Sequence, residues 1–297
     1  MNVQDIQIIG VIGAGQMGGG IAQLAAQHGF RTLVTDVNIE IAACAKDKIA
    51  DILGKQVAKG KLPATAREET LGRLEPVAGL SRLAEADFVI EAATENLELK
   101  LQILREASAR ARNDAILATN TSSISITRLA AVVTRPDQVI GMHFMNPVPL
   151  MKLVEIIRAV QTSPATYETT RSLAVLLGKT VVTSEDRPGF VINRMLIPFL
   201  NEACFALEAG IATPEDIDQG ARLGLNHPMG PLELADFVGL DTVLAISEVL
   251  HKDFGDDKYR PPVLLRNLVA AGWYGRKTGR GFYVYDDKGE KLKNSFG

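Results

Sequence analysis

The sequence has few cysteines, little net charge and no long apolar run, and each of these absences excludes a class of protein. Only Cys44 and Cys204 occur in 297 residues, both in segments with helical patterning. A disulfide framework is therefore not expected, and both are predicted to be small, buried, reduced thiols. The formal net charge of −3 does not indicate a nucleic-acid-binding or membrane-binding surface. No apolar run approaches the roughly 18 residues that a membrane-spanning helix needs.

Other missing signals bear on location and metal content. The N-terminal MNVQDIQIIG lacks the basic region and small-residue cleavage site of a signal peptide, so we expect a cytoplasmic protein. No CxxC motif or His/Cys cluster is present, so no metal site is expected. At 46% hydrophobic and 23% charged residues the composition is that of an ordinary globular protein. The length suggests roughly two domains of about 150 residues each.

The first part of the chain alternates short apolar runs with amphipathic stretches. The apolar runs are residues 6–13, 31–36, 87–93, 115–120, 139–144 and 179–184. Several are apolar at successive positions, which is typical of strands buried on both faces of a parallel sheet. Helical patterns lie between them, for example at 21–29 and 96–112. This alternation predicts a doubly wound, mostly parallel α/β domain over residues 1–185.

From about residue 186 the pattern becomes helical. Residues 186–210 place apolar side chains at helical spacing and end on a glycine. Thr213 then begins the sequence TPED, an N-cap followed by proline at the first helical position. Further helical patterns at 231–251 and 261–271 precede the short segment GFYVYD. A smaller, all-α domain is therefore predicted over residues 186–297.

A glycine-rich loop directly follows the first apolar run. Gly13, Gly15 and Gly18 form a GxGxxG motif between a predicted strand and a predicted helix. In such a motif the first glycine permits a tight turn, the second lets the backbone approach a pyrophosphate, and the third allows close helix–strand packing. The helix N-terminus then offers N–H groups to the phosphates. A glycine turn without any ligand is the alternative interpretation.

Asp36 ends the second apolar run, 18 positions after Gly18. This spacing is close to that of the acidic residue that accepts hydrogen bonds from a ribose diol in dinucleotide-binding domains. Its charge would repel a 2′-phosphate. The first domain is therefore predicted to be of the Rossmann type and to bind NAD in preference to NADP.

The segment VIGMHFMNPVPLMKLVEII, residues 139–157, contains two ionisable side chains in apolar surroundings. Pro147 and Pro149 break the run, so the chain can reverse and bring Glu155 beside His143. A carboxylate on one ring nitrogen would fix the tautomer and favour the protonated ring. The other nitrogen would then serve as the base for an alcohol whose carbon loses a hydride. A satisfied core histidine with a surface glutamate is the alternative.

Six segments together resemble the NAD-dependent L-3-hydroxyacyl-CoA dehydrogenases, and the short bacterial 3-hydroxybutyryl-CoA dehydrogenases are the most similar in length and layout. The segments are VIGAGQMGGGIAQ, TENLELK, TNTSSISI, HFMNPVPLMKLVEII, DRPGFVINRML and HPMGPLELADFVGLD. The resemblance covers almost the whole chain, and the six segments occur in the same order. The resemblance implies reversible hydride transfer between NAD and the 3-position of a short-chain acyl-CoA. It also implies a homodimer, with the second domain closing the substrate site and supplying the interface.

The resemblance assigns roles to individual residues. It implies His143 as the base in alcohol oxidation and Glu155 as its orienting partner, with Ser122 and Asn193 holding the substrate oxygen. The implied cofactor contacts are Gly13, Gly15, Gln16, Met17, Gly18, Asp36, Glu95, Lys100, Asn120 and Asn146. A plain helical face is the alternative for Glu95 and Lys100. Lys55 and Lys59 are implied contacts of coenzyme A, with a solvated charge run as the alternative.

Two other functions stay open at this point. One is a dehydrogenase of a free hydroxy acid or sugar acid on the same scaffold. The other is a nucleotide-binding protein without turnover. Retention of the four residues His143, Glu155, Ser122 and Asn193 argues against the second, because a protein without catalysis has no need of them all.

Overall fold

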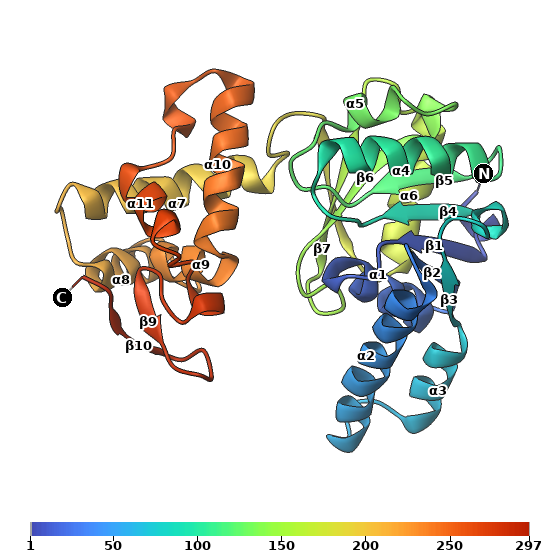
Figure 1. Ribbon diagram of the computed structural model, residues 1–297, viewed down its shortest axis with the longest axis horizontal. Helices are drawn as coiled ribbons and strands as arrows, with labels where there is room; N and C mark the ends of the chain where they lie inside the picture. Colours follow the sequence, from blue (N-terminus) through green and yellow to red (C-terminus); the bar gives the residue numbers. More distant parts are fainter. Residues whose placement is uncertain (1, 297) are drawn as a thin grey trace. The chain divides into compact units, whose positions relative to one another are not determined.

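The structure is a computed structural model that describes residues 2–296 (Figure 1). It divides into two compact units, the first ending at Phe190 and the second beginning at Val191. The boundary predicted near residue 185 falls five residues before this division. Two residues tie the segment 186–190 to the first unit: Asp186 accepts hydrogen bonds from the backbone N–H groups of Ile126 and Thr127, and the Phe190 ring lies beside His143.

An eight-stranded sheet forms the centre of the first unit, in the order β3-β2-β1-β4-β5-β6-β7-β8. The strands are β1 Ile8–Ile12, β2 Arg31–Asp36, β3 Leu74–Ala78, β4 Phe88–Glu91, β5 Ile116–Thr119, β6 Val139–Phe144, β7 Leu153–Arg158 and β8 Thr180–Glu185. Neighbouring strands pair in parallel except β6 with β7. The predicted mostly parallel sheet is confirmed. Strand β3 was not predicted, because its segment LEPVA is only partly buried and carries a glutamate and a proline.

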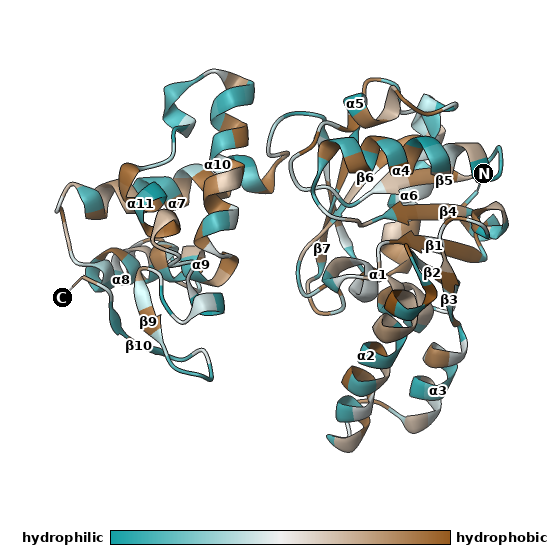
Figure 2. Cartoon of the chain, in the orientation of Figure 1, coloured by the Kyte–Doolittle hydropathy of each residue, from teal (hydrophilic) through white to brown (hydrophobic). Residues whose placement is uncertain are grey.

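Helices cover both faces of this sheet. They are α1 Gln16–Gln27, α2 Ile39–Ala58, α3 Ala64–Gly72, α4 Leu97–Arg110, α5 Ile126–Ala130 and α6 Pro164–Leu176. Residues of α1, α2 and α6 share one buried apolar cluster, whereas residues of α4 and α5 share another. Within β4, Phe88 and Ile90 belong to the first cluster and Val89 to the second. Successive side chains of a strand point to opposite faces, so the doubly wound arrangement is confirmed. Figure 2 shows the hydrophobic central strands β1 and β4.

The second unit is mainly helical, as predicted. Its helices are α7 Ile192–Glu208, α8 Pro214–Gly224, α9 Pro231–Val238, α10 Leu240–Phe254 and α11 Val263–Ala270. Thr213 caps α8, because its hydroxyl accepts a hydrogen bond from the backbone N–H of Asp216 at 3.2 Å. Two details need correction. The pattern at 231–251 is two helices divided at Gly239, where φ is +102°. The terminal segment is an antiparallel hairpin of β9 Tyr283–Tyr285 and β10 Lys291–Asn294, so the unit is not entirely α.

Asp236, on α9, anchors this hairpin. Its carboxylate accepts hydrogen bonds from the backbone N–H groups of Phe282 and Tyr283 and from the hydroxyl of Tyr285, each at 2.9 Å. The side chain is buried, and burial raises the pKa of Asp236 to about 6. The hairpin therefore depends on a carboxylate that is costly to keep charged.

The two cysteines differ in exposure. Cys204 is buried on α7, as predicted, and burial raises the pKa of its thiol to about 12. Cys44 is exposed on α2, so the prediction of a buried thiol was wrong there. Its side chain lines a cavity beside the sheet instead of the core. Within residues 2–296, no helix is both long enough and apolar enough to cross a membrane.

Candidate dinucleotide and acid–base site

The glycine turn after β1 has the geometry that a phosphate-binding loop requires. Gly13 adopts a φ of +97°, and a Cβ atom there would lie 2.7 Å from the carbonyl oxygen of Ala92. A Cβ on Gly18 would lie 1.7 Å from the carbonyl oxygen of Gly13, so only glycine allows α1 to approach the turn this closely. A Cβ on Gly15, the N-cap of α1, would meet no atom within 4 Å. The first and third glycines thus shape the turn, and the second faces open space where a ligand phosphate fits.

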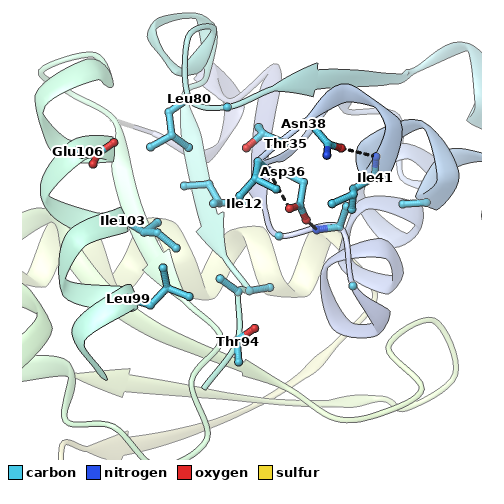
Figure 3. A pocket seen from close by; sticks show the side chains of 18 of the residues that line it. Ile12, Thr35, Asp36, Asn38, Ile41, Leu80, Thr94, Leu99, Ile103 and Glu106 are labelled. Atoms are coloured by element: carbon cyan, nitrogen blue, oxygen red, sulfur yellow. Dashed lines mark hydrogen bonds between the residues drawn. The ribbon is translucent and has the colours of Figure 1, made fainter. Parts of the chain in front are cut away.

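Asp36 stands beside this turn at the end of β2. Its carboxylate accepts hydrogen bonds from the backbone N–H of Ala14 at 2.7 Å and of Val37 at 2.8 Å (Figure 3). These contacts join the acidic side chain to the glycine loop itself. A carboxylate held in this position can accept hydrogen bonds from a ribose diol, and its charge repels a 2′-phosphate.

A cavity of about 1250 Å³ opens next to these residues. It is lined by the glycine loop, by Asp36 and by apolar side chains of several elements, among them Ile41, Leu80, Leu99 and Ile103 (Figure 3). Apolar walls suit an adenine ring, the helix N-terminus suits a pyrophosphate, and Asp36 suits a ribose. The residues present therefore fit NAD.

His143 and Glu155 are in contact. They face each other in the antiparallel register of β6 and β7, and His143 Nδ1 lies 2.8 Å from Glu155 Oε2. The carboxylate is completely buried and the histidine is 8% exposed. The ring of Phe190 packs edge-on against the imidazole, with 5.9 Å between ring centroids. The predicted pair thus exists, and it leaves Nε2 as the ring nitrogen for proton transfer to a substrate.

Glu95 holds the loop that carries Ser122. Its Oε1 accepts hydrogen bonds from the Thr121 hydroxyl at 2.6 Å and from the backbone N–H groups of Ser122 at 2.9 Å and Ser123 at 3.1 Å. Burial tends to raise the pKa of the Glu95 carboxyl, but the nearby Lys100 ammonium and these hydrogen bonds outweigh it and lower the pKa. The carboxylate is therefore held in its charged form at the end of the sheet where the glycine loop lies.

The two asparagines tie further loops together. Asn120 Oδ1 accepts a hydrogen bond from the backbone N–H of Phe144 at 2.8 Å, next to His143. Asn146 Oδ1 accepts one from Gln16 Nε2 at 3.2 Å, which links the loop after β6 to the first turn of α1. Most of the predicted residues of the first unit thus gather at the carboxyl ends of β1, β2, β4, β5 and β6. Ligands of doubly wound sheets bind at that edge.

Other predicted residues lie elsewhere. Met17 is half-buried in α1, Lys55 and Lys59 are exposed near the end of α2, and Asn193 is buried in the first turn of α7 in the second unit. Lys100 is 1% exposed and donates hydrogen bonds to Glu91, so the alternative of a plain helical face is wrong for this residue.

The sequence analysis did not single out Glu91, which is completely buried at the end of β4. The available signal was an acidic residue within the apolar run DFVIEAA. Among residues 2–296, no cluster of His, Cys, Asp and Glu side chains is arranged to hold a metal ion.

Models of known protein families match both units of the chain. Residues 8–187 match the NAD-binding domain of 3-hydroxyacyl-CoA dehydrogenase, and residues 189–285 match its C-terminal domain. The chain belongs to the 3-hydroxyacyl-CoA dehydrogenase family. The family resemblance found in the sequence is confirmed, as are the NAD cofactor and the dehydrogenase class.

Individual relatives are similar over nearly their whole length. A probable 3-hydroxybutyryl-CoA dehydrogenase of Deinococcus radiodurans is 54% identical over 93% of this chain and 99% of its own. The 3-hydroxybutyryl-CoA dehydrogenase of Bradyrhizobium diazoefficiens is 50% identical over 94% and 96%. The crystal structure of (S)-3-hydroxybutyryl-CoA dehydrogenase from Ralstonia eutropha is 48% identical, with a TM-score of 0.93, over 95% of this chain and 100% of that one.

Proposed function

We propose that the protein interconverts (S)-3-hydroxyacyl-CoA and 3-oxoacyl-CoA with NAD, and that its substrates are short-chain thioesters such as 3-hydroxybutyryl-CoA and acetoacetyl-CoA. The observation that carries the proposal is the buried His143–Glu155 pair at the same sheet edge as the glycine loop. The short-chain assignment is supported by the names of the relatives with 50% and 54% identity.

In the oxidation direction His143 Nε2 accepts the proton of the 3-hydroxyl group. NAD, when bound, supplies the acceptor for the hydride that leaves the same carbon. Glu155 accepts a hydrogen bond from the Nδ1–H group of His143. This contact fixes the tautomer and stabilises the positive charge that the ring acquires. In the reduction direction the same nitrogen returns the proton to the substrate oxygen.

Ser122 and Asn193 are proposed to donate hydrogen bonds to the substrate oxygen and so to orient the reacting carbon. For Ser122 the support is its loop, which Glu95 fixes by accepting hydrogen bonds from the backbone N–H groups of Ser122 and Ser123. For Asn193 the support is its sequence context in GFVINR. Gly13, Gly15, Gln16, Met17, Gly18, Asp36, Glu95, Asn120 and Asn146 are the proposed cofactor-side residues.

Lys55 and Lys59 are proposed to bind the phosphates of coenzyme A. Lys55 is exposed in the last turn of α2 and Lys59 is exposed at the C-cap of that helix, and Ile52 and Gln56 of α2 line a cavity of about 410 Å³. A double charge reversal, Lys55→Glu with Lys59→Glu, should raise KM for acetoacetyl-CoA at low salt and leave KM for NADH unchanged. High salt should reduce the difference, because exposed charges are screened. An unchanged KM for the thioester would leave the lysines as a solvated charge run.

The protein is further proposed to be a cytoplasmic homodimer. The helical unit leaves several large apolar side chains exposed, including Met195, Ile211, Leu223 and Leu225, which a partner copy would cover. Sedimentation at micromolar concentration should give twice the mass of one chain. A monomer mass would contradict the assembly and leave the proposed reaction unaffected.

The central test compares NADH oxidation with acetoacetyl-CoA and with free acetoacetate at the same concentrations. Turnover of the thioester alone is expected. Turnover of the free acid alone would instead support a dehydrogenase of free hydroxy acids. Enhanced NADH fluorescence without turnover of any thioester would indicate a binding protein.

A further inference from the structure

We propose that Glu91 and Lys100 form a buried positioning pair that sets both the glycine loop of the cofactor site and the loop carrying Ser122. The role of the Ser122 loop rests on the function proposed above. The effect on the glycine loop rests on the cofactor site alone.

Glu91 is the centre of this arrangement. Its Oε1 accepts hydrogen bonds from Lys100 Nζ at 2.7 Å and from the backbone N–H of Ala93 at 2.6 Å. Its Oε2 accepts from Lys100 Nζ at 2.9 Å and from the Thr119 hydroxyl at 2.6 Å. The carboxylate is completely buried at the end of β4, and it joins β4, β5 and α4. A buried charge with this many donors is satisfied where it stands.

Lys100 has no N–H group left for a cofactor. An ammonium has three donors, and Nζ contacts both oxygens of Glu91 and the carbonyl oxygen of Ala93, the last at 3.1 Å. Glu95 Oε2 lies 3.6 Å away, so the same ammonium also attracts the carboxylate that holds the Ser122 loop. The geometry thus favours an indirect role for Lys100 over the direct cofactor contact that the family resemblance implied.

The pair holds the backbone of Ala93 at both its N–H and its carbonyl group. Glu91 accepts from its N–H, and Lys100 donates to its carbonyl oxygen. Gly13 packs against this stretch so closely that a Cβ there would lie 2.9 Å from Ala93 N. Ala92, Ala93 and Thr94 also line the large cavity, and Thr94 is labelled in Figure 3. A displacement of the Ala93 peptide would therefore move the wall against which the cofactor loop turns.

A structural and a positioning role predict different results for matched variants. Removing one partner of a buried ion pair leaves the other charge buried without a partner, which lowers stability. Replacing both residues by uncharged ones of similar size often restores stability. Glu91→Gln alone should therefore lower Tm. Glu91→Gln with Lys100→Met should recover most of Tm, but it cannot hold the Ala93 carbonyl oxygen because Met has no donor.

Asp87 provides the matched control just before the opposite end of β4. It is a buried carboxylate that accepts hydrogen bonds from the backbone N–H groups of Gln7 at 2.8 Å and Ile8 at 2.9 Å and pairs with Arg112. None of these partners belongs to the cofactor loop. Asp87→Asn should lower Tm without changing NADH affinity.

The experiment measures Tm of the apoprotein, Kd for NADH by fluorescence, and kcat and KM with acetoacetyl-CoA for the wild type and all three variants. The Glu91/Lys100 double variant should bind NADH more weakly and turn over up to about 100-fold more slowly, the size of rate effect that a misplacement of about 1 Å produces. Wild-type Kd and kcat in a folded double variant would overturn the proposal, as would an equal rise of Kd in Asp87→Asn. If the wild type binds NADH but reduces no thioester, the proposed function fails while the NADH measurements still decide this inference.

Discussion

Glu155→Gln is the substitution that tests the acid–base pair most directly. It replaces a completely buried carboxylate, 2.8 Å from His143 Nδ1, by a neutral amide of nearly the same size. The shape of the site is kept and one negative charge is lost. The change therefore acts on the step in which the imidazole becomes positively charged, and it should have little effect on binding of the cofactor.

The expected loss follows from the strength of one hydrogen bond. A hydrogen bond to a charged group contributes about 1.5–3 kcal/mol and a neutral one about 0.5–1.5 kcal/mol. The difference of about 1–1.5 kcal/mol corresponds to roughly a fivefold to 13-fold lower rate. Gln can also donate its N–H to Nδ1 and so select the tautomer that protonates Nε2, which blocks the base. We therefore expect kcat to fall by about tenfold to 100-fold.

The assay is steady-state turnover in both directions at saturating cofactor, with Kd for NADH measured by fluorescence. Glu185→Gln is the matched control, because that side chain lies at the end of β8 in the same sheet and is 70% exposed. The control should retain wild-type kcat. Unchanged turnover in Glu155→Gln, or a rise in Kd for NADH as large as the fall in kcat, would refute the reasoning.

Four further predictions concern separate parts of the molecule. His143→Gln should lower kcat by about 10²-fold to 10⁴-fold with little change in NADH affinity; His28→Gln, at the end of α1, is its control and should keep full activity. Asp36→Ala should weaken NADH binding and reduce the preference over NADPH, which comparison of the two Kd values would show; an unchanged ratio would exclude Asp36 as the selector. Cys44, which is exposed and lines the large cavity, should react with N-ethylmaleimide more slowly when NADH is bound, and equal rates would place the dinucleotide elsewhere. Burial raises the pKa of Asp236 from about 3.8 in the unfolded chain to about 6 in the folded protein. Between these two pH values the folded protein binds a proton at Asp236 that the unfolded chain does not bind. The free energy of unfolding should therefore fall by about 3 kcal/mol as the pH rises from 3.8 to 6. Urea denaturation at several pH values should show a flatter profile for Asp236→Asn, and parallel profiles would contradict the assignment.

Much of the fold was predictable because its signals are local. Strands buried on both faces of a parallel sheet must be apolar at successive positions. A turn with the φ of Gly13 and the close approach of Gly18 to it admit only glycine. Thr213 caps a helix through a hydrogen bond to a residue three positions later. In each case the signal is carried by residues that are close together in the sequence.

The contact between His143 and Glu155 was predictable for a related reason. Only eleven residues separate His143 from Glu155, and two prolines among them favour a turn. The chain therefore reverses direction, and the antiparallel register of β6 and β7 brings the two side chains together. The division at Gly239 was missed because the apolar pattern continues across it. The exposure of Cys44 was missed because the pattern of α2 does not show which side of the helix faces a cavity.

The sequence by itself determined the alternation of strands and helices, the glycine loop with Asp36, and the contact between His143 and Glu155. Only the tertiary structure decided that Lys100 pairs with Glu91 in the interior and that these two residues hold the Ala93 peptide against Gly13. Strand and helix patterns depend on neighbours along the chain. The partners of the buried Glu91 carboxylate depend instead on how β4, β5 and α4 pack together. The order of residues along the chain does not specify the distances between these three elements.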